Sequence, residues 1–545
     1  MTWNLVIIGA GASGTAMLIA YVRRLRERGA ALARRTRITV VEATGDFGPG
    51  LPYGADAAPF HLMNMGAGTV SVLADRPLDF VDWLRGCGAA EVDGVADVPA
   101  MFTSRHLFGR YLRERFAAHV AEARGLGAEV ELLAGRVTGV RRAGGGLRVA
   151  VAGRGALDAD AVTLASGHWH PANTDHCRRR GAEMARTGDG GLFFPWPATR
   201  LARAVRPGTT VAVLGTALTA VDAYLTIAHA LGTFVPAGPG GVDYVPDGPP
   251  VRILAFSRHG LLPGVRTERG PAGLDANPYL AAAPVPGMDE DGELNRAHLT
   301  RRLDAAVRWA CGEDARPLDA RSGGGGERTG TEHALLRDGI DRCRRADPAW
   351  AASQLTMRSF LDAATWMQER MSEPERRRVE REFIAPYFVE TSAIPYANAL
   401  YLEALLRAGV LRVFGGFDGV TVRDAFRVRH RDGGTVRVTT TPWLVNAIGR
   451  ARDLGPHAGL PARLVATGLL GAEPLGGVRA TRTDGFARGP DGCALPDVAV
   501  LGPLTVGTDV GASRVFAAAR RADTIADGWL DARPAVTELD EVTRG

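Results

Sequence analysis

The sequence contains no lysine, and all 65 of the basic residues among its 545 residues are arginine. A Walker-type phosphate loop needs a lysine, and an enzyme that works through a Schiff base needs an amine, so both classes are excluded. Any anionic group that the protein binds must therefore be held by arginine, histidine, backbone N–H groups or helix N-termini.

Cysteine and excess charge are also scarce. The net charge is only +5, and the short basic clusters 178–180 and 376–378 predict solvated helix faces rather than a nucleic-acid surface. The apolar run 5–22 contains several glycines and has no basic segment before it, so we expect neither a signal peptide nor a membrane span. No C-x-x-C pair occurs, which argues against a metal site or a redox dithiol, and an odd, sparse count favours a cytoplasmic protein with reduced thiols. The five cysteines are Cys87, Cys177, Cys311, Cys343 and Cys493.

The first forty-two residues predict a dinucleotide site. An apolar strand at 4–9 runs into a G-x-G-x-x-G motif made by Gly9, Gly11 and Gly14, and a helix-favouring segment follows. In this context the glycines allow a tight turn, close approach of a pyrophosphate to the backbone, and packing of the helix on the sheet. A second strand ends at Glu42, whose carboxylate can accept hydrogen bonds from an adenosine ribose.

A second strand, turn and helix begin at 209–215. Ala217 and Ala220 stand where the second and third glycines of the motif would be, so we expect looser or shifted binding there. The next strand, 251–256, ends in Ser257 and Arg258. A cation at this strand tip suits the 2′-phosphate of NADPH better than the free ribose of NADH.

The order of these units predicts nesting. Strands at 161–167 and 497–502 and a helix at 511–526 are typical of the late elements that line the flavin in proteins with two dinucleotide sites. We therefore predict an α/β fold with two nested Rossmann-like dinucleotide-binding domains, one for FAD and one for NADPH. The expected segments are a FAD-binding domain at 1–200 and 396–535, an NADPH-binding domain at 205–395 with a helical insertion at about 290–385, and a tail at 536–545.

These residues resemble a family, the FAD/NAD(P)-binding proteins related to class B flavin monooxygenases. The Baeyer–Villiger pattern F-x-G-x-x-x-H-x-x-x-W is absent, since the nearest stretch, 166–170, does not fit it. The sequence looks most like the N-oxygenating enzymes that convert L-aspartate into a nitroso or nitro succinate. The resemblance covers most of the chain and is carried by segments 9–14, 48–53, 61–64, 104–105, 111–112, 215–222, 257–263 and 446–449.

The resemblance implies a monooxygenase of secondary metabolite biosynthesis that uses FAD, NADPH and molecular oxygen. Such an enzyme N-hydroxylates an amino acid amine through a C4a-hydroperoxyflavin, and it is compatible with a homodimer. The cofactor-binding residues that the resemblance implies are Gly9, Gly11, Ser13, Gly14, Glu42, Tyr53, Arg105, Val137, Ser166, Gly167, Gly215, Thr216, Ser257, Arg258, Gly502 and Ala512.

The candidate catalytic and substrate-binding residues follow from the same resemblance. It places His61 and Asn64 near the flavin, where His61 could assist proton transfer and Asn64 could donate a hydrogen bond. A buried histidine and a turn-forming asparagine are the structural alternatives. A dicarboxylic substrate needs cations with fork geometry, and Arg266, Arg450 and Arg452 are the candidates.

Two other classes stay open at this point. A FAD-dependent NAD(P)H oxidoreductase acting on another small molecule would carry the same two nucleotide motifs. A non-catalytic redox-sensing or scaffold protein requires that Ala217 abolish nicotinamide nucleotide binding. Consumption of NADPH that depends on both oxygen and an amine would separate the monooxygenase from these alternatives.

Overall fold

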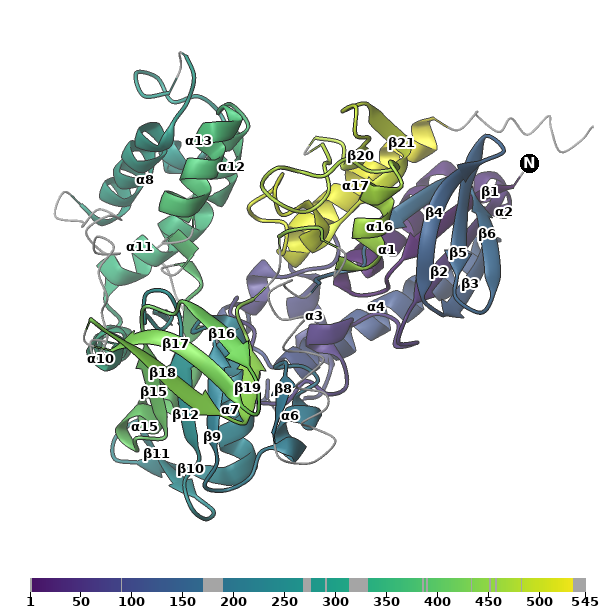
Figure 1. Cartoon of the computed structure of the whole chain (residues 1–545). Helices are drawn as coiled ribbons and strands as arrows, with labels where there is room; N and C mark the ends of the chain where they lie inside the picture. Colours follow the sequence, from purple (N-terminus) through teal and green to yellow (C-terminus); the bar gives the residue numbers. More distant parts are fainter. Residues whose placement is uncertain are drawn as a thin grey trace, which may run out of the picture. The chain divides into compact units, whose positions relative to one another are not determined.

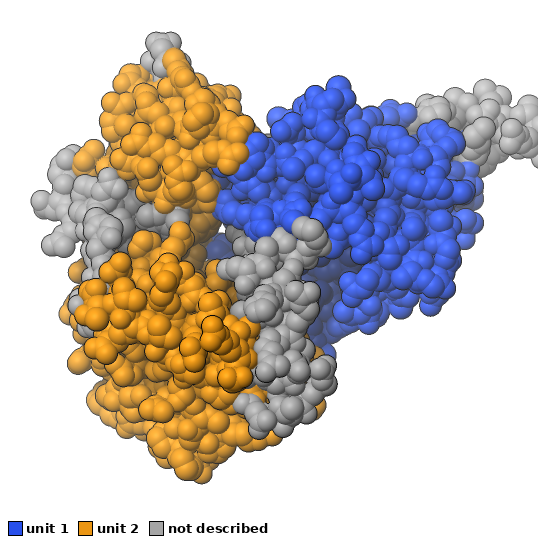
Figure 2. All heavy atoms as spheres, viewed as in Figure 1, with its two compact units in different colours: residues 1–55, 65–172, 450–545 blue, residues 56–64, 173–449 orange. Residues whose placement is uncertain are grey.

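The computed structural model describes residues 2–89, 91–169, 190–267, 276–289, 292–312, 332–384, 387–388, 391–432, 434–449, 452–455, 458–481 and 483–532. The chain forms two compact units, which Figure 2 distinguishes by colour. Unit 1 comprises residues 1–55, 65–172 and 450–545, and unit 2 comprises residues 56–64 and 173–449. Each unit contains a parallel sheet flanked by helices, which confirms the predicted α/β class.

The sheet of unit 1 has six strands in the order β20-β21-β7-β1-β2-β3 (Figure 1). All neighbours pair in parallel except β20 and β21. The strands nearest the centre are almost entirely buried and apolar, as expected for a parallel sheet covered on both faces. The strands are β1 (Trp3–Ile8), β2 (Thr36–Glu42), β3 (Glu129–Ala134), β7 (Ala161–Leu164), β20 (Phe486–Arg488) and β21 (Ala494–Val500).

Helix α1 (Ala12–Arg28) follows β1 and packs against α4 (Arg105–Gly125) and against α17 (Val515–Asp531) near the C-terminus. Arginine–aspartate pairs join α1 to α17. Arg24 is 3.2 Å from Asp523 and 2.9 Å from Asp527. The unit also contains α2 (Ala30–Arg34), α3 (Asp79–Gly86), α16 (Leu460–Ala466), β4 (Val137–Ala143), β5 (Gly146–Val151), β6 (Gly155–Ala159) and the short helices η1 (Leu51–Tyr53), η2 (Ala67–Thr69), η3 (Val98–Ala100) and η9 (Gly502–Thr505).

The sheet of unit 2 has five parallel strands in the order β15-β12-β9-β19-β8. Side chains of one face pack with helix α7 (Leu218–Leu231), and those of the other face pack with the antiparallel strands β16 and β17. The strands are β8 (Gly191–Phe193), β9 (Thr210–Leu214), β12 (Arg252–Phe256), β15 (Leu411–Phe414), β16 (Gly419–Val422), β17 (Phe426–Asp432), β18 (Thr435–Thr441) and β19 (Trp443–Asn446).

Helices occupy the part of unit 2 in which we expected a helical insertion (Figure 1). A two-stranded ribbon of β13 (Val265–Arg266) and β14 (Ile394–Pro395) lies beside them. The helices are α8 (Arg296–Cys311), α10 (Glu332–Arg344), α11 (Pro348–Ser359), α12 (Leu361–Gln368), α13 (Glu373–Val379) and the π-helix η7 (Glu380–Ile384). Unit 2 further contains α6 (Ala198–Ala204), α15 (Tyr396–Arg407), β10 (Gly232–Ala237), β11 (Gly241–Pro246) and η6 (Pro278–Leu280).

The boundaries of the units differ from the segments that we expected. We placed the return to the FAD-binding domain at 396, whereas the chain returns to unit 1 at 450. The reason is that β15 and β19 join the sheet of unit 2 beside β12 and β9. Strand β8, which we assigned to the first domain, also belongs to the sheet of unit 2, because it pairs with β19. The excursion of residues 56–64 into unit 2 has no counterpart in the prediction, and the expected tail lies outside the described residues.

Candidate functional site

The first glycine loop connects β1 to α1 at the carboxyl edge of the sheet of unit 1. Gly9 has φ +95°, and a Cβ at this position would lie 2.4 Å from the carbonyl oxygen of Ala165. A Cβ on Gly14 would lie 1.9 Å from the carbonyl oxygen of Gly9. Neither position can therefore hold a side chain. Gly11 is the N-cap of α1 and offers no side-chain cap, so the first amides of the helix can bind a phosphate.

Glu42 closes the same loop from the tip of β2. Its Oε2 accepts a hydrogen bond from Ala10 N at 2.9 Å, and its Oε1 accepts from Thr44 N and Thr44 Oγ1 at 3.0 and 2.9 Å. The carboxylate thus lies beside the glycine loop, on the strand next to β1. This is the position from which an acidic residue can accept hydrogen bonds from an adenosine ribose.

Several other predicted FAD residues lie around the first glycine loop. A Cβ on Gly502 would lie 2.5 Å from Ser13 Oγ, and a Cβ on Gly9 would lie 3.2 Å from Ser166 Cα. Gly167 is the next residue after Ser166. A Cβ on Gly50 would lie 2.9 Å from Gly11 Cα, so the 48–50 turn also reaches the loop.

The remaining predicted FAD residues belong to unit 1 but have other surroundings. The Tyr53 ring packs edge-on against Phe108, with 5.0 Å between ring centroids. Arg105 is the first residue of α4. Val137 starts β4 and is buried in the apolar core. Ala512 lies just before α17, and its amide donates to the carbonyl of Asp509 at 3.1 Å.

The second glycine loop has the same position in the sheet of unit 2. Gly215 has φ +108°, and a Cβ there would lie 2.4 Å from the carbonyl oxygen of Ala447. Ala217 is the N-cap of α7 and gives it no side-chain cap, so the first amides of this 14-residue helix can also bind a phosphate. Thr216 between them is buried.

The tip of β12 carries the predicted Ser257 and Arg258. Ser257 Oγ accepts a hydrogen bond from Gly260 N at 3.0 Å, and the Arg258 carbonyl accepts from Gly416 N at 3.0 Å. Burial of His259, and then the neighbouring charge of Arg258, lower the pKa of His259. The strand next to β9 therefore ends in a fixed turn that carries a positive charge.

His61 lies in the interior of unit 2. Its side chain is fully buried, with Nε2 2.9 Å from Thr226 Oγ1 and 3.2 Å from the carbonyl oxygen of Asp222, both on α7. The neighbouring Phe60 stacks on His229 at 3.9 Å between ring centroids. Burial, and then the proximity of His61, lower the pKa of His229 to about 4. These surroundings resemble those of a core histidine. Asn64 is the last residue of the segment 56–64, which belongs to unit 2.

The candidate substrate arginines fall into different parts of the chain. Arg266 is buried in unit 2 at the end of β13. Arg450 lies outside the described residues. The structure therefore does not bring these two candidates together in one described site.

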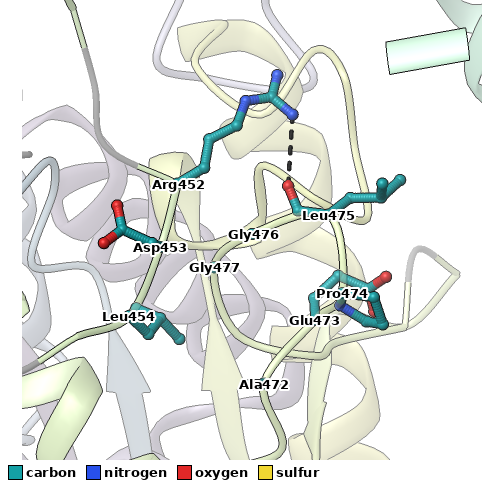
Figure 3. Close-up of a pocket in the computed structure, with 9 residues that line it drawn as sticks. All are labelled: Arg452, Asp453, Leu454, Ala472, Glu473, Pro474, Leu475, Gly476 and Gly477. Atoms are coloured by element: carbon teal, nitrogen blue, oxygen red, sulfur yellow. Dashed lines mark hydrogen bonds between the residues drawn. The ribbon is translucent and has the colours of Figure 1, made fainter. Parts of the chain in front are cut away.

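Arg452 lies in a different place, at the rim of a small pocket of unit 1 (Figure 3). Its Nη1 donates to the carbonyl of Leu475 at 3.4 Å, and its own carbonyl accepts from Gly477 N at 2.8 Å. A Cβ on Gly477 would lie 2.2 Å from the carbonyl oxygen of Leu504, close to the end of β21. The pocket is lined by Arg452, Asp453, Leu454, Ala472, Glu473, Pro474, Leu475, Gly476 and Gly477.

The sequence patterns missed the role of α11 beside Arg266. Gln354 bonds to the backbone on both sides of Arg266, and the charge of Arg358, four residues later on the same helix, lowers the pKa of Arg266; this spacing was the available signal. That spacing does not tell which strand the helix covers.

Across the described ranges, no group of three or more histidine, cysteine or acidic side chains could hold a metal ion. Among these residues we also find no helix with the length and apolar character that crossing a bilayer requires.

Comparisons with known proteins agree with this geometry. Residues 6–169, which contain the first glycine loop and Glu42, match the model of a family described as FAD-NAD(P)-binding. No curated protein sequence is significantly similar to the chain. The segment that matches the model is therefore of the FAD-NAD(P)-binding class.

Solved structures extend the likeness to nearly the whole chain. Ornithine hydroxylase from Pseudomonas aeruginosa is 15% identical over 97% of this chain and 99% of that chain, with a TM-score of 0.51. Its reduced form is 14% identical over the same shares, with a TM-score of 0.54. L-lysine 6-monooxygenase from Pseudomonas syringae is 16% identical, with the same coverage and a TM-score of 0.51. At these identities the similarity shows a shared fold.

Proposed function

We propose that the protein is a FAD- and NADPH-dependent monooxygenase that N-hydroxylates the amine of an amino acid. The observation that carries this proposal is the pair of glycine loops on two nested units, with Glu42 at one strand tip and Arg258 at the other. A carboxylate suits a ribose hydroxyl, and a guanidinium suits a phosphate. The two loops therefore favour two different dinucleotides.

The residues of each loop fit its proposed cofactor. Gly9, Gly11 and the N-terminus of α1 would hold the pyrophosphate of FAD, and Glu42 would hold its ribose. Gly215 and the N-terminus of α7 would hold the pyrophosphate of NADPH, and Arg258 its 2′-phosphate. When bound, the flavin supplies the oxygen chemistry and NADPH supplies the two electrons.

The reaction inserts one oxygen atom of O₂ into an N–H bond of the substrate. The other oxygen atom leaves as water, and NADPH with one proton is consumed. The ornithine and lysine hydroxylases that share the fold support an amino acid as substrate. We propose L-aspartate as that amino acid, oxidised in successive steps to a nitroso or nitro succinate. Asn64 is proposed to act near the flavin by hydrogen bonding, whereas the complete burial of His61 against α7 favours a structural role for that residue.

The test follows NADPH oxidation in air by the FAD-loaded protein, with and without L-aspartate, and identifies the product by mass. We expect turnover that depends on both aspartate and oxygen, with a nitroso or nitro product. Slow, aspartate-independent formation of hydrogen peroxide would contradict the proposed substrate. Oxygen-independent transfer of electrons from NADPH to another acceptor would favour an oxidoreductase instead.

A further inference from the structure

The backbone around Arg266 is held in place by α11 and α10. Gln354 Nε2 donates to the carbonyl of Val265 at 2.6 Å, and Gln354 Oε1 accepts from Thr267 N at 3.2 Å. On the α10 side, a Cβ on Gly339 would lie 2.8 Å from Val265 Cγ2, so helix and strand are in close contact. The backbone of Arg266 is therefore fixed on both sides, which limits the movement of its side chain toward solvent.

The guanidinium of Arg266 is buried, and no acidic side chain of the described residues forms an ion pair with it. The residue is 5% exposed. Among the described residues its Nη2 donates to the carbonyl of Thr391 at 2.6 Å, and its Nε has no hydrogen-bond partner. None of the salt bridges between described residues includes it. Buried charged groups in proteins are normally paired, because an uncompensated charge in the interior is costly.

The charge of Arg358, which acts on Arg266, has the same sign. Arg358 lies four residues after Gln354 on α11 and so shares the helix face that contacts β13. Burial of the guanidinium, and then the charge of Arg358, lower the pKa of Arg266 to about 9. The protein thus places two cations near one another in a region of low solvent access.

A second buried arginine of unit 2 provides the contrast. Arg302 on α8 is fully buried, and its Nη1 lies 2.5 Å from Asp289 Oδ2. Its Nε donates to the carbonyl of Tyr279 at 2.9 Å, and its Nη2 donates to the carbonyl of Ala281. Among the described residues, Arg302 thus has three oxygen acceptors, one of them a carboxylate, whereas the side chain of Arg266 has one neutral acceptor.

We propose that Arg266 binds a carboxylate group of the substrate, which supplies the counter-charge that the described residues do not provide. A carboxylate matches the free N–H groups of a guanidinium by hydrogen bonding as well as by charge. The identification of the ligand as an amino acid or diacid rests on the proposed function. The site would select substrates that carry at least one carboxylate and would exclude simple diamines.

The test is thermal unfolding of the full-length, FAD-loaded protein without NADPH. The probes are L-aspartate, succinate, inorganic phosphate and sodium chloride at equal ionic strength. We expect L-aspartate and succinate to raise the melting temperature more than phosphate or chloride, because a ligand that binds the native state stabilises it. In the variant Arg266→Met this carboxylate-dependent rise should disappear.

The ligand-free melting temperatures separate a binding role from a structural one. Removal of an uncompensated buried charge should leave Arg266→Met at least as stable as the unmodified protein. A melting temperature that falls in Arg266→Met, together with a retained aspartate shift, would overturn the proposal. Equal shifts with aspartate, phosphate and chloride would also overturn it, because the site would then bind any anion.

Arg302→Met is the matched control, because it removes a buried arginine that has its counter-ion. We expect a lower melting temperature and an unchanged aspartate shift. If this variant does not fold, Arg302→Met combined with Asp289→Leu removes both charges and serves instead. An Arg266-dependent aspartate shift without N-oxidation would preserve the site and refute the proposed function. N-oxidation of aspartate with an unchanged KM in Arg266→Met would support the proposed function and refute the carboxylate site at Arg266.

Discussion

The two glycine loops share their first position and differ at the others. A Cβ on Gly9 or on Gly215 would meet the carbonyl oxygen of the neighbouring strand's end at the same distance, 2.4 Å. At the third position, Gly14 lies against Gly9 with no room for a methyl group, whereas unit 2 has a buried alanine, Ala220. The first glycine is thus required by the strand-to-helix turn itself. The later glycines depend on how closely each helix approaches its own turn.

The charge at the neighbouring strand tip is the second difference. Glu42 accepts hydrogen bonds from the loop of unit 1 and carries a negative charge, whereas Arg258 carries a positive charge beside the loop of unit 2. The same architecture therefore offers one surface for hydroxyl groups and another for a phosphate. Four changes test this comparison, beginning with the largest expected effect.

Gly14→Ala should have the largest effect, because the new methyl group would lie 1.9 Å from the carbonyl oxygen of Gly9. We expect a loss of about 3 kcal/mol or more in the free energy of unfolding and no stable flavin binding. Denaturant unfolding and flavin absorbance after gel filtration measure the two effects. Gly86→Ala is the control, since nothing lies within 4 Å of its Cβ, and it should keep the flavin.

Arg258→Ala should raise the KM for NADPH by about 10- to 100-fold. This is the loss of affinity expected when a charged hydrogen bond to the 2′-phosphate is removed. The KM for NADH should stay within about twofold, because NADH has no such phosphate. Initial rates with both nucleotides measure the ratio. Arg252→Ala changes an arginine at the other end of β12 that bonds to Thr210, and it should leave the ratio unchanged. A parallel change in both KM values would contradict the assignment.

Glu42→Gln should weaken FAD binding by about tenfold, corresponding to about 1.4 kcal/mol, because the ribose loses a charged acceptor. The KM for NADPH should not change, since Glu42 belongs to the other unit. Flavin titration followed by fluorescence gives the dissociation constant. Unaltered FAD affinity would mean that Glu42 serves only to hold Ala10 and Thr44.

Ala217→Gly should have the smallest effect, a tightening of NADPH binding by a factor of about 2 to 10, which corresponds to about 0.4 to 1.4 kcal/mol. Removal of the methyl group lets a pyrophosphate approach the backbone more closely. The greater backbone freedom of glycine opposes this gain, which is why the effect is small. Calorimetric titration with NADP⁺ measures it. Weaker binding of NADP⁺ to Ala217→Gly would contradict this expectation, because it would show that the alanine helps to hold the loop in the conformation that binds the nucleotide.

Local patterns predicted the fold class and both loops because each loop is a contiguous strand, turn and helix. Glu42 and Arg258 could be found for the same reason, since Glu42 ends β2 and Arg258 lies two residues beyond β12. The pairing of β15 and β19 with the second sheet could not be found, because an apolar strand does not specify its sheet. The burial of Arg266 also depends on packing: nothing in the segment 257–266 shows that the residue is buried with no ion pair to a described acidic side chain.

The pairing of α1 with α17 has a consequence for the order in which the protein forms. Strands β20 and β21 and helix α17 lie within 486–531, so the first unit lacks an edge of its sheet and a covering helix until residue 531 has been synthesised. The five-stranded sheet of unit 2 is entirely made by residue 446. On the ribosome the second unit can thus fold before the first, although the first unit begins earlier in the chain.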